Sequence, residues 1–161
     1  MENIIQKRRS IRKFSNKAID ESAIQQLVDA FQASPCGMHE TDVMQAVVVT
    51  DPTLLSRIAK TTDNAAYGAP LLFLIATKND SKFGERDASA AAENVMIQAT
   101  ALGLGSVYVM SGALKINSDS QLLSSLGLEQ GYQATVMVPV GRAAESGSND
   151  DRHARYHVVY K

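Results

Sequence analysis

The stretch RDASAAAENVMIQATAL, from Arg86 to Leu102, predicts a long helix because its residues have high helix propensity and include neither glycine nor proline. Its first half is unusually slim because of four alanines, Ala88, Ala90, Ala91 and Ala92. Another backbone or a flat ligand could therefore approach this half closely. The run GLGSVYVM, Gly103 to Met110, follows with two glycines and then a predicted strand.

Outward from this helix, hydrophobic runs predict three buried strands: QAVVVT (Gln45 to Thr50), LLFLIA (Leu71 to Ala76) and QATVMVPVG (Gln133 to Gly141). Helix-start signals predict three more helices: one after Asp20 that ends near Pro35 and Gly37, one after Asp51, and SDSQLLSSLGL (Ser118 to Leu128) with Gly127 at its end. The alternation predicts one layered domain over residues 1–161, of either the α/β or the α+β class.

The end of the chain differs in composition from the predicted core. Ala143 to Asp151, AAESGSNDD, reads as a polar loop of small residues. Beyond it, YHVVY (Tyr156 to Tyr160) has strand character but is separated from the core by that loop.

The overall charge excludes one broad class of function. The 161 residues carry a formal net charge of −1, whereas proteins that bind nucleic acid through bulk counterion release usually carry a large excess of Lys and Arg. Neither a signal peptide nor a membrane span is visible in the sequence, and a cytoplasmic location is the default expectation. Because the chain is nearly neutral overall, any site for an anion must be formed by a local cluster of positive side chains.

The segment KRRSIRKF, Lys7 to Phe14, concentrates positive charge on this nearly neutral chain. Arginine presents a planar fork that can grip phosphate oxygens in pairs, and a serine hydroxyl adds a short donor. The pattern R-x-S-x-R of Arg8, Ser10 and Arg12 therefore suits one phosphate group. The alternative interpretation is a solvated charged turn.

Four stretches resemble, in order, the FMN-dependent nitroreductase family: RRSIRKFSNKAI, ASPCGMHETDVMQAVVVTD, AAENVMIQATALGLGSVYV and VPVGRAAE. The resemblance spans nearly the whole chain. It implies that Arg8, Ser10 and Arg12 contact the flavin phosphate. Arg9 is a further candidate for cofactor binding; the alternative is an exposed residue that contributes only surface charge. A basic residue near the C-terminus often completes the family's phosphate site, and both Arg152 and Arg155 are candidates for it.

Further candidates would face the flavin ring. Where the family commonly has Asn and Gln beside the ring, this chain has His39 and Thr41. The resemblance also places Tyr108, Val109, Ser111 and Gly112 along the ring, where backbone amides could stabilise the charge that develops on reduction.

The resemblance implies an α+β three-layer fold, with a mostly antiparallel sheet flanked by helices. It also implies a homodimer with two FMN sites at its interface, to which the slim helix and the YHVVY segment could contribute. The implied activity passes a hydride from NADH or NADPH through FMN to a nitroaromatic, a quinone or a similar small acceptor. Because the chain is shorter than most family members, a more open pocket is expected.

Two other functions stay open at this point: a flavin-binding store or redox sensor without efficient turnover, and a thiol enzyme that uses Cys36 with His39. A small buried residue is the favoured interpretation of Cys36. His153 and His157 are spaced four residues apart, but in a segment of extended character without a carboxylate pattern, so no metal site is expected. Glu93 and Asn94 are interpreted as solvated or interface residues.

Overall fold

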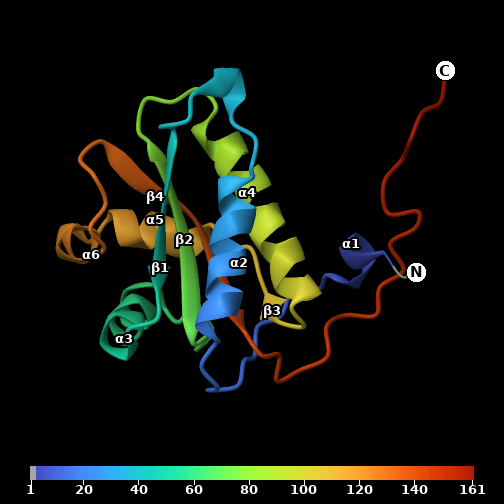
Figure 1. Ribbon diagram of the computed structural model, residues 1–161, viewed down its shortest axis with the longest axis horizontal. Coiled ribbons are helices and arrows are strands. Elements are labelled where there is room, and N and C mark those ends of the chain that lie inside the picture. Colours follow the sequence, from blue (N-terminus) through green and yellow to red (C-terminus); the bar gives the residue numbers. More distant parts are fainter. Residues whose placement is uncertain (1–2) are drawn as a thin grey trace.

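The computed structural model describes residues 3–161 and has three layers, with helices on both faces of a central sheet (Figure 1). Its four strands are ordered β1-β2-β4-β3, and every paired neighbour runs antiparallel. They span Met44–Val49 (β1), Leu71–Lys78 (β2), Tyr132–Gly141 (β4) and Gly105–Ser106 (β3). This architecture confirms the α+β three-layer fold expected from the resemblance.

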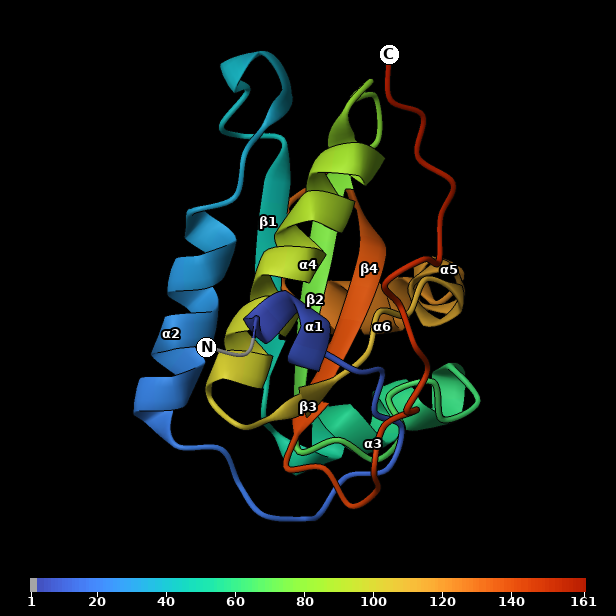
Figure 2. The same cartoon turned by 90° about the vertical axis from the view of Figure 1, so that its right-hand side faces the viewer.

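One face of the sheet is covered by α2, Glu21–Gln32, and α4, Gly84–Ala101. Figure 2, seen from this side, shows α4 in front of the strands with α2 beside it. The α2 side chain Phe31 meets Phe73 of β2, with ring centroids 5.7 Å apart. Three of the four alanines of the slim helix, Ala88, Ala91 and Ala92, are fully buried in this core cluster with Phe73. Their small size therefore lets α4 lie close to the sheet of its own chain.

The opposite face carries α3, Pro52–Thr61, α5, Ser111–Asn117, and α6, Ser120–Ser125. Its core includes Leu72, Leu74 and Met137 from the strands, packed with Ile58 and Ile116 from the helices. Alternate residues of β2 and β4 thus enter different cores, as strand geometry requires, and this is why both strands read as continuous apolar runs.

Helix starts and ends follow the predicted signals closely. The Asp51 carboxylate accepts the Leu54 amide at 2.7 Å and begins α3, and Asp119 accepts the Leu122 amide at 2.9 Å and begins α6. Gly127, predicted to end α6, has a φ of 68°, which glycine adopts without strain. Asp20 precedes α2 as predicted, although its side chain makes no capping hydrogen bond.

Four segments differ from the expectations. The strand predicted after Gly103 shrinks to Gly105–Ser106 plus an isolated bridge from Val109 to Met137, because the chain turns away into α5. The short helices α1, Ile4–Lys7, and α5 were not predicted. Residues 156–160 form no strand within this chain, and Tyr156 and Tyr160 are 79% and 90% exposed.

Ser10 and Ile11 attach to the β3 edge of the sheet. Ser10 forms a parallel bridge with Ser106, and the Ile11 amide donates to the Ser106 carbonyl at 3.0 Å. Gly105 makes room for this, since a Cβ on it would lie 2.9 Å from three carbons of the Ile11 side chain. The R-x-S-x-R segment and the GLG turn are therefore packed directly together.

Candidate functional site

The two ends of the chain together form a polar pocket of about 410 Å³. Residues 8–12 supply one wall and residues 145–155 supply the other. The lining residues are Arg8, Arg9, Ser10, Arg12, Glu145, Ser146, Gly147, Ser148, Asp150, Arg152 and Arg155. All six predicted phosphate-site candidates are thus brought into one cavity, although the two groups are more than 130 residues apart in sequence.

Two of the arginines fasten the walls to each other. The Arg9 Nε donates to the Ser148 carbonyl at 2.6 Å, and its Nη1 donates to the carbonyls of Arg8, at 3.0 Å, and Gln6. The Arg152 guanidinium also donates to the Gln6 carbonyl. Gly147 lies against the Arg9 side chain, where a Cβ would come within 2.3 Å of the Arg9 Cβ. Through these contacts, Arg9 and Arg152 join the two walls of the pocket.

Three carboxylates balance part of the pocket's positive charge. The Glu145 Oε1 accepts the Arg12 amide at 2.7 Å, Arg8 Nε lies 3.3 Å from Glu93 Oε1, and Arg155 Nη2 lies 3.6 Å from Asp150 Oδ2. The five lining arginines and these three acids leave a formal charge of +2. A phosphate monoester carries about −1.5 to −2 near pH 7, so the donor set fits one such group in both charge and chemistry.

The segment expected along the flavin ring begins at the same sheet edge, just after Ser106. Val109 exchanges both backbone hydrogen bonds with Met137, at 2.9 and 2.8 Å, so its amide is already used inside the fold. The Tyr108 hydroxyl lies 3.0 Å from the Ser89 Oγ of α4. Ser111 and Gly112 open α5, where first-turn amides have no carbonyl partner within the helix. A Cβ at Gly112 would lie 2.4 Å from the Met137 sulfur, which gives this glycine a packing role as well.

His39 and Thr41 lie near the opposite end of the sheet. They precede β1 at its Met44 end, which pairs with Thr77, whereas the arginine pocket adjoins the end where Leu71 pairs with Val140. Strand spacings of about 4.8 Å and a rise of about 3.3 Å per residue put the two places on the order of 20 Å apart. One chain therefore does not bring His39 and Thr41 into the arginine pocket.

The loop that carries these two residues is anchored to the sheet. The Tyr132 hydroxyl donates to the Asp42 carbonyl, and Lys78 Nζ donates to the Asp42 carboxylate. The Lys78 hydrogen bond and charge lower the pKa of Asp42, and the hydrogen bond to Asp42 is the main cause that raises the pKa of Lys78. Met38 and His39 have positive φ angles, 55° and 60°, so the loop turns sharply there.

Cys36 is half-buried and lines a second cavity, of about 500 Å³, together with Thr41 and residues 43–47 along the outer edge of β1. Within residues 3–161 no hydrogen bond joins Cys36 to His39. The geometry thus gives no support to a thiol–imidazole pair, and a packing role for Cys36 fits better.

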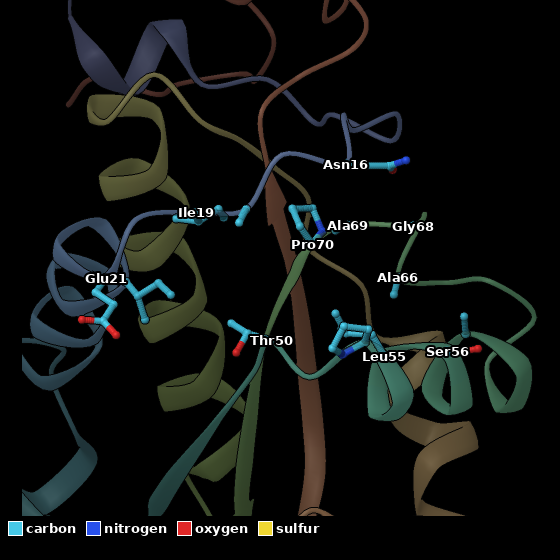
Figure 3. Close-up of a pocket in the computed structure, with 14 residues that line it drawn as sticks. Asn16, Ile19, Glu21, Thr50, Leu55, Ser56, Ala66, Gly68, Ala69 and Pro70 are labelled. Carbon is cyan, nitrogen blue, oxygen red and sulfur yellow. The ribbon is translucent and has the colours of Figure 1, made fainter.

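A further cavity, of about 680 Å³, contains none of the residues singled out in the sequence as candidates for the cofactor site (Figure 3). It lies between the loop before α2, the helix α3 and the loop before β2, and its walls are mainly apolar, with Ile19, Leu55 and Pro70 turned toward it. None of the predicted cofactor residues lines it.

Sequence reasoning missed the acidic residues of the arginine pocket. Glu145 is the last residue of the VPVGRAAE stretch, and its spacing from Gly141 was the one signal that could have pointed to it. Glu93 was interpreted as a solvated or interface residue, and Asp150 lies in a loop without a recognisable motif. Their pairing with arginines depends on contacts between distant segments.

Two negative results apply to residues 3–161. No helix there combines the length and hydropathy needed to cross a bilayer. No group of three or more His, Cys, Asp or Glu side chains in this range is arranged to hold a metal ion.

Comparison with known proteins agrees with the motifs. The family model described as "Putative TM nitroreductase" matches residues 1–160. A protein of Methanothermobacter thermautotrophicus named "Putative NADH dehydrogenase/NAD(P)H nitroreductase" is 28% identical over 110 residues, which cover 65% of this chain and 57% of that protein. The chain thus spans little more than half the length of this relative.

Two crystal structures of nitroreductases with bound FMN share the fold over essentially their whole length. The one from Bacteroides fragilis is 20% identical, with a TM-score of 0.84 over 99% of this chain and 100% of that one. The one from Desulfitobacterium hafniense is 17% identical, with a TM-score of 0.87 and complete coverage of both chains. The resemblance drawn from the four motifs is confirmed, and the chain belongs to the nitroreductase family.

Proposed function

We propose that this protein is an FMN-dependent oxidoreductase that uses NADH or NADPH to reduce a nitroaromatic, a quinone or a similar small acceptor. The observation that carries the proposal is the pocket formed by both chain ends, whose arginines and Ser10 suit a phosphate monoester. FMN, when bound, supplies the hydride chemistry, which explains why the protein needs no nucleophile or acid–base pair of its own.

The roles of the chain's own residues follow from their positions. Arg8, Ser10 and Arg12 would bind the phosphate, and the bridge from Ser10 to Ser106 fixes their place at the sheet edge. Tyr108, Ser111 and Gly112 would lie along the ring, with the Tyr108 hydroxyl held by Ser89. Val109 would position this segment without binding the ring, because both of its backbone groups are bonded to Met137 and its side chain is buried in the core.

A homodimer would bring the remaining candidates to the site. His39 and Thr41 lie too far from the arginine pocket of their own chain, so a second subunit would have to present them to the ring. In the described chain, β1 pairs only with β2, and the 500 Å³ cavity runs along its outer edge. Residues 156–160, apolar and exposed, would add to that edge in the second subunit.

The absorption spectrum of the purified protein tests the proposal most directly. We expect yellow protein that releases FMN on denaturation and consumes NADH or NADPH when a nitroaromatic or a quinone is present. Bound FMN without acceptor-dependent turnover would instead assign a flavin store or redox sensor. Colourless protein that binds no added FMN would refute both flavin functions.

Light scattering after size exclusion tests the homodimer. We expect a mass twice the 17.4 kDa of the chain, and a shift toward the monomer when Val158 and Val159 are both replaced by Asp. A monomeric wild-type protein that binds FMN fully would contradict the shared site.

A further inference from the structure

Arg152 and Arg155 line the same pocket but are held very differently. The Arg152 guanidinium donates to the Gln6 backbone carbonyl, a contact that joins the two chain ends. Arg155 is held by an ion pair with Asp150 at 3.6 Å, and its side chain is 40% exposed. An exposed ion pair at this distance is weak and easily exchanged. Arg155 is therefore the arginine that can turn toward a new anion without breaking the connection between the chain ends.

Asp150 is paired with Arg155, for which a phosphate bound in the pocket would compete. It lines the pocket, and its Oδ2 accepts the Ser148 hydroxyl at 2.9 Å while facing Arg155. A phosphate group in the pocket would be repelled by this carboxylate and attracted by the guanidinium beside it. Since the Asp150 side chain is 61% exposed, it can turn out to solvent once Arg155 has another partner.

We propose that Asp150 is an internal competitor for the flavin phosphate, and that Arg155 completes the phosphate site by exchanging Asp150 for it. This inference rests on the proposed FMN function. Asp150 then limits cofactor affinity and favours release, while Arg8 and Arg12 supply the constant part of the binding. The acidic residue in the pocket is thus a determinant of how tightly the cofactor is retained.

The test is a fluorescence titration of the flavin-free protein with FMN in four variants and the wild type. Asp150→Asn should tighten binding roughly threefold to tenfold, because it removes both the competing ion pair and the repulsion. Asp151→Asn is the matched control: it removes the same charge at the neighbouring position, where the carboxylate accepts only the His153 amide among the described interactions. It should change affinity less than about twofold. Arg155→Gln should weaken binding about tenfold or more.

The fourth variant combines Asp150→Asn with Arg155→Gln and isolates the exchange from a general charge effect. The gain from Asp150→Asn should shrink to less than about twofold in the Arg155→Gln background, because only the repulsion between the carboxylate and the phosphate is then left to remove. Equal effects of Asp150→Asn and Asp151→Asn, or an undiminished gain without Arg155, would overturn the inference.

A second ligand separates this inference from the proposed function. Inorganic phosphate is titrated against the same proteins, with its protection against thermal unfolding as the readout. The same ranking with phosphate, in a protein that binds no FMN, would support the exchange and refute the flavin function. A protein protected by neither ligand would refute both.

Discussion

Replacing Gly105 by Ala tests whether the GLG turn positions the arginines that we propose bind the phosphate. The added Cβ would lie 2.9 Å from the Cβ, Cγ1 and Cγ2 of Ile11. Carbon atoms pack at about 3.5 to 4.0 Å, so Ile11 must move by roughly 0.6 to 1 Å. Overpacking of this kind costs typically about 1 to 3 kcal/mol, and we expect the free energy of unfolding to fall by that amount.

The same displacement should reduce the affinity for FMN. Ile11 lies between Ser10 and Arg12, and its amide holds the segment to the Ser106 carbonyl at 3.0 Å. A shift near 1 Å would break or lengthen at least one charge-assisted hydrogen bond, each worth about 1.5 to 3 kcal/mol, so FMN affinity should fall about tenfold or more. Urea unfolding measures the first effect and fluorescence titration the second.

Gly103→Ala is the matched control. Gly103 has a φ of 72°, and a Cβ on it would meet no atom within 4 Å among the described residues beyond its chain neighbours. Ala there is therefore strained by about 1 to 2 kcal/mol but displaces nothing. It should lower stability and leave FMN affinity unchanged. Combining Gly105→Ala with Ile11→Ala should cost less than the sum of the two changes, because the smaller side chain relieves the contact. Equal FMN affinities in the Gly103 and Gly105 variants would refute the reasoning.

Three further predictions concern the pocket and the helix starts. Arg8→Ala or Arg12→Ala should weaken FMN binding by about 1.5 to 3 kcal/mol in a fluorescence titration, whereas Lys17→Ala, which removes a charge outside the pocket, should not. Asp51→Ala should lower the free energy of unfolding by about 1 kcal/mol in urea, because α3 loses its cap. The pKa of Asp119 is lowered from 3.8, first by the hydrogen bond from the Leu122 amide and then by the hydrogen bond from Thr61 and the charge of Arg57. The ionised Asp119 carboxylate therefore stabilises the fold above pH 3.8, and this stabilisation is lost as the pH falls through the lower pKa of the folded state. Asp119→Asn should therefore flatten the loss of stability that urea titrations record as the pH falls below 3.8.

For each of these three predictions, a specific result would contradict the reasoning. Unchanged FMN titrations in both arginine variants would refute the phosphate assignment, and an Asp51 variant as stable as the wild type would refute the capping role. Asp20→Asn is the control for Asp119, since Asp20 precedes a helix without a capping hydrogen bond. An acid profile of the Asp119 variant identical to that of the wild type would contradict the linkage.

Local signals predicted most of the fold. A few neighbouring residues suffice to predict the helix caps at Asp51 and Asp119 and the buried strands. These elements appear in the structure with boundaries close to those expected. The helix α5 was missed because SGALKIN is too short for a helical period and contains Gly112. The strand order β1-β2-β4-β3 depends on pairing between distant segments, which periodicity does not encode.

The arginines and the serine that line the pocket could be named from the sequence as phosphate candidates, but their interaction partners could not. The sequence grouped Arg8 with Arg12 through their spacing, and the motif resemblance added Arg152 and Arg155. That Arg9 and Arg152 bind backbone carbonyls, while Arg155 faces Asp150, follows from side-chain contacts between the two chain ends. The alanines of α4 likewise suggested an approach by a partner or ligand, and only the packed fold shows that most of them face the sheet.

A pocket built from residues 6–12 and 145–155 also constrains when it can exist during synthesis. A ribosome adds about 5 to 20 residues per second, and the first arginines emerge well before their counterparts. Until Arg155 has left the exit tunnel, the basic segment has no second wall. Under the proposed function, cofactor binding that uses both walls is therefore a late event, which follows completion of the sheet.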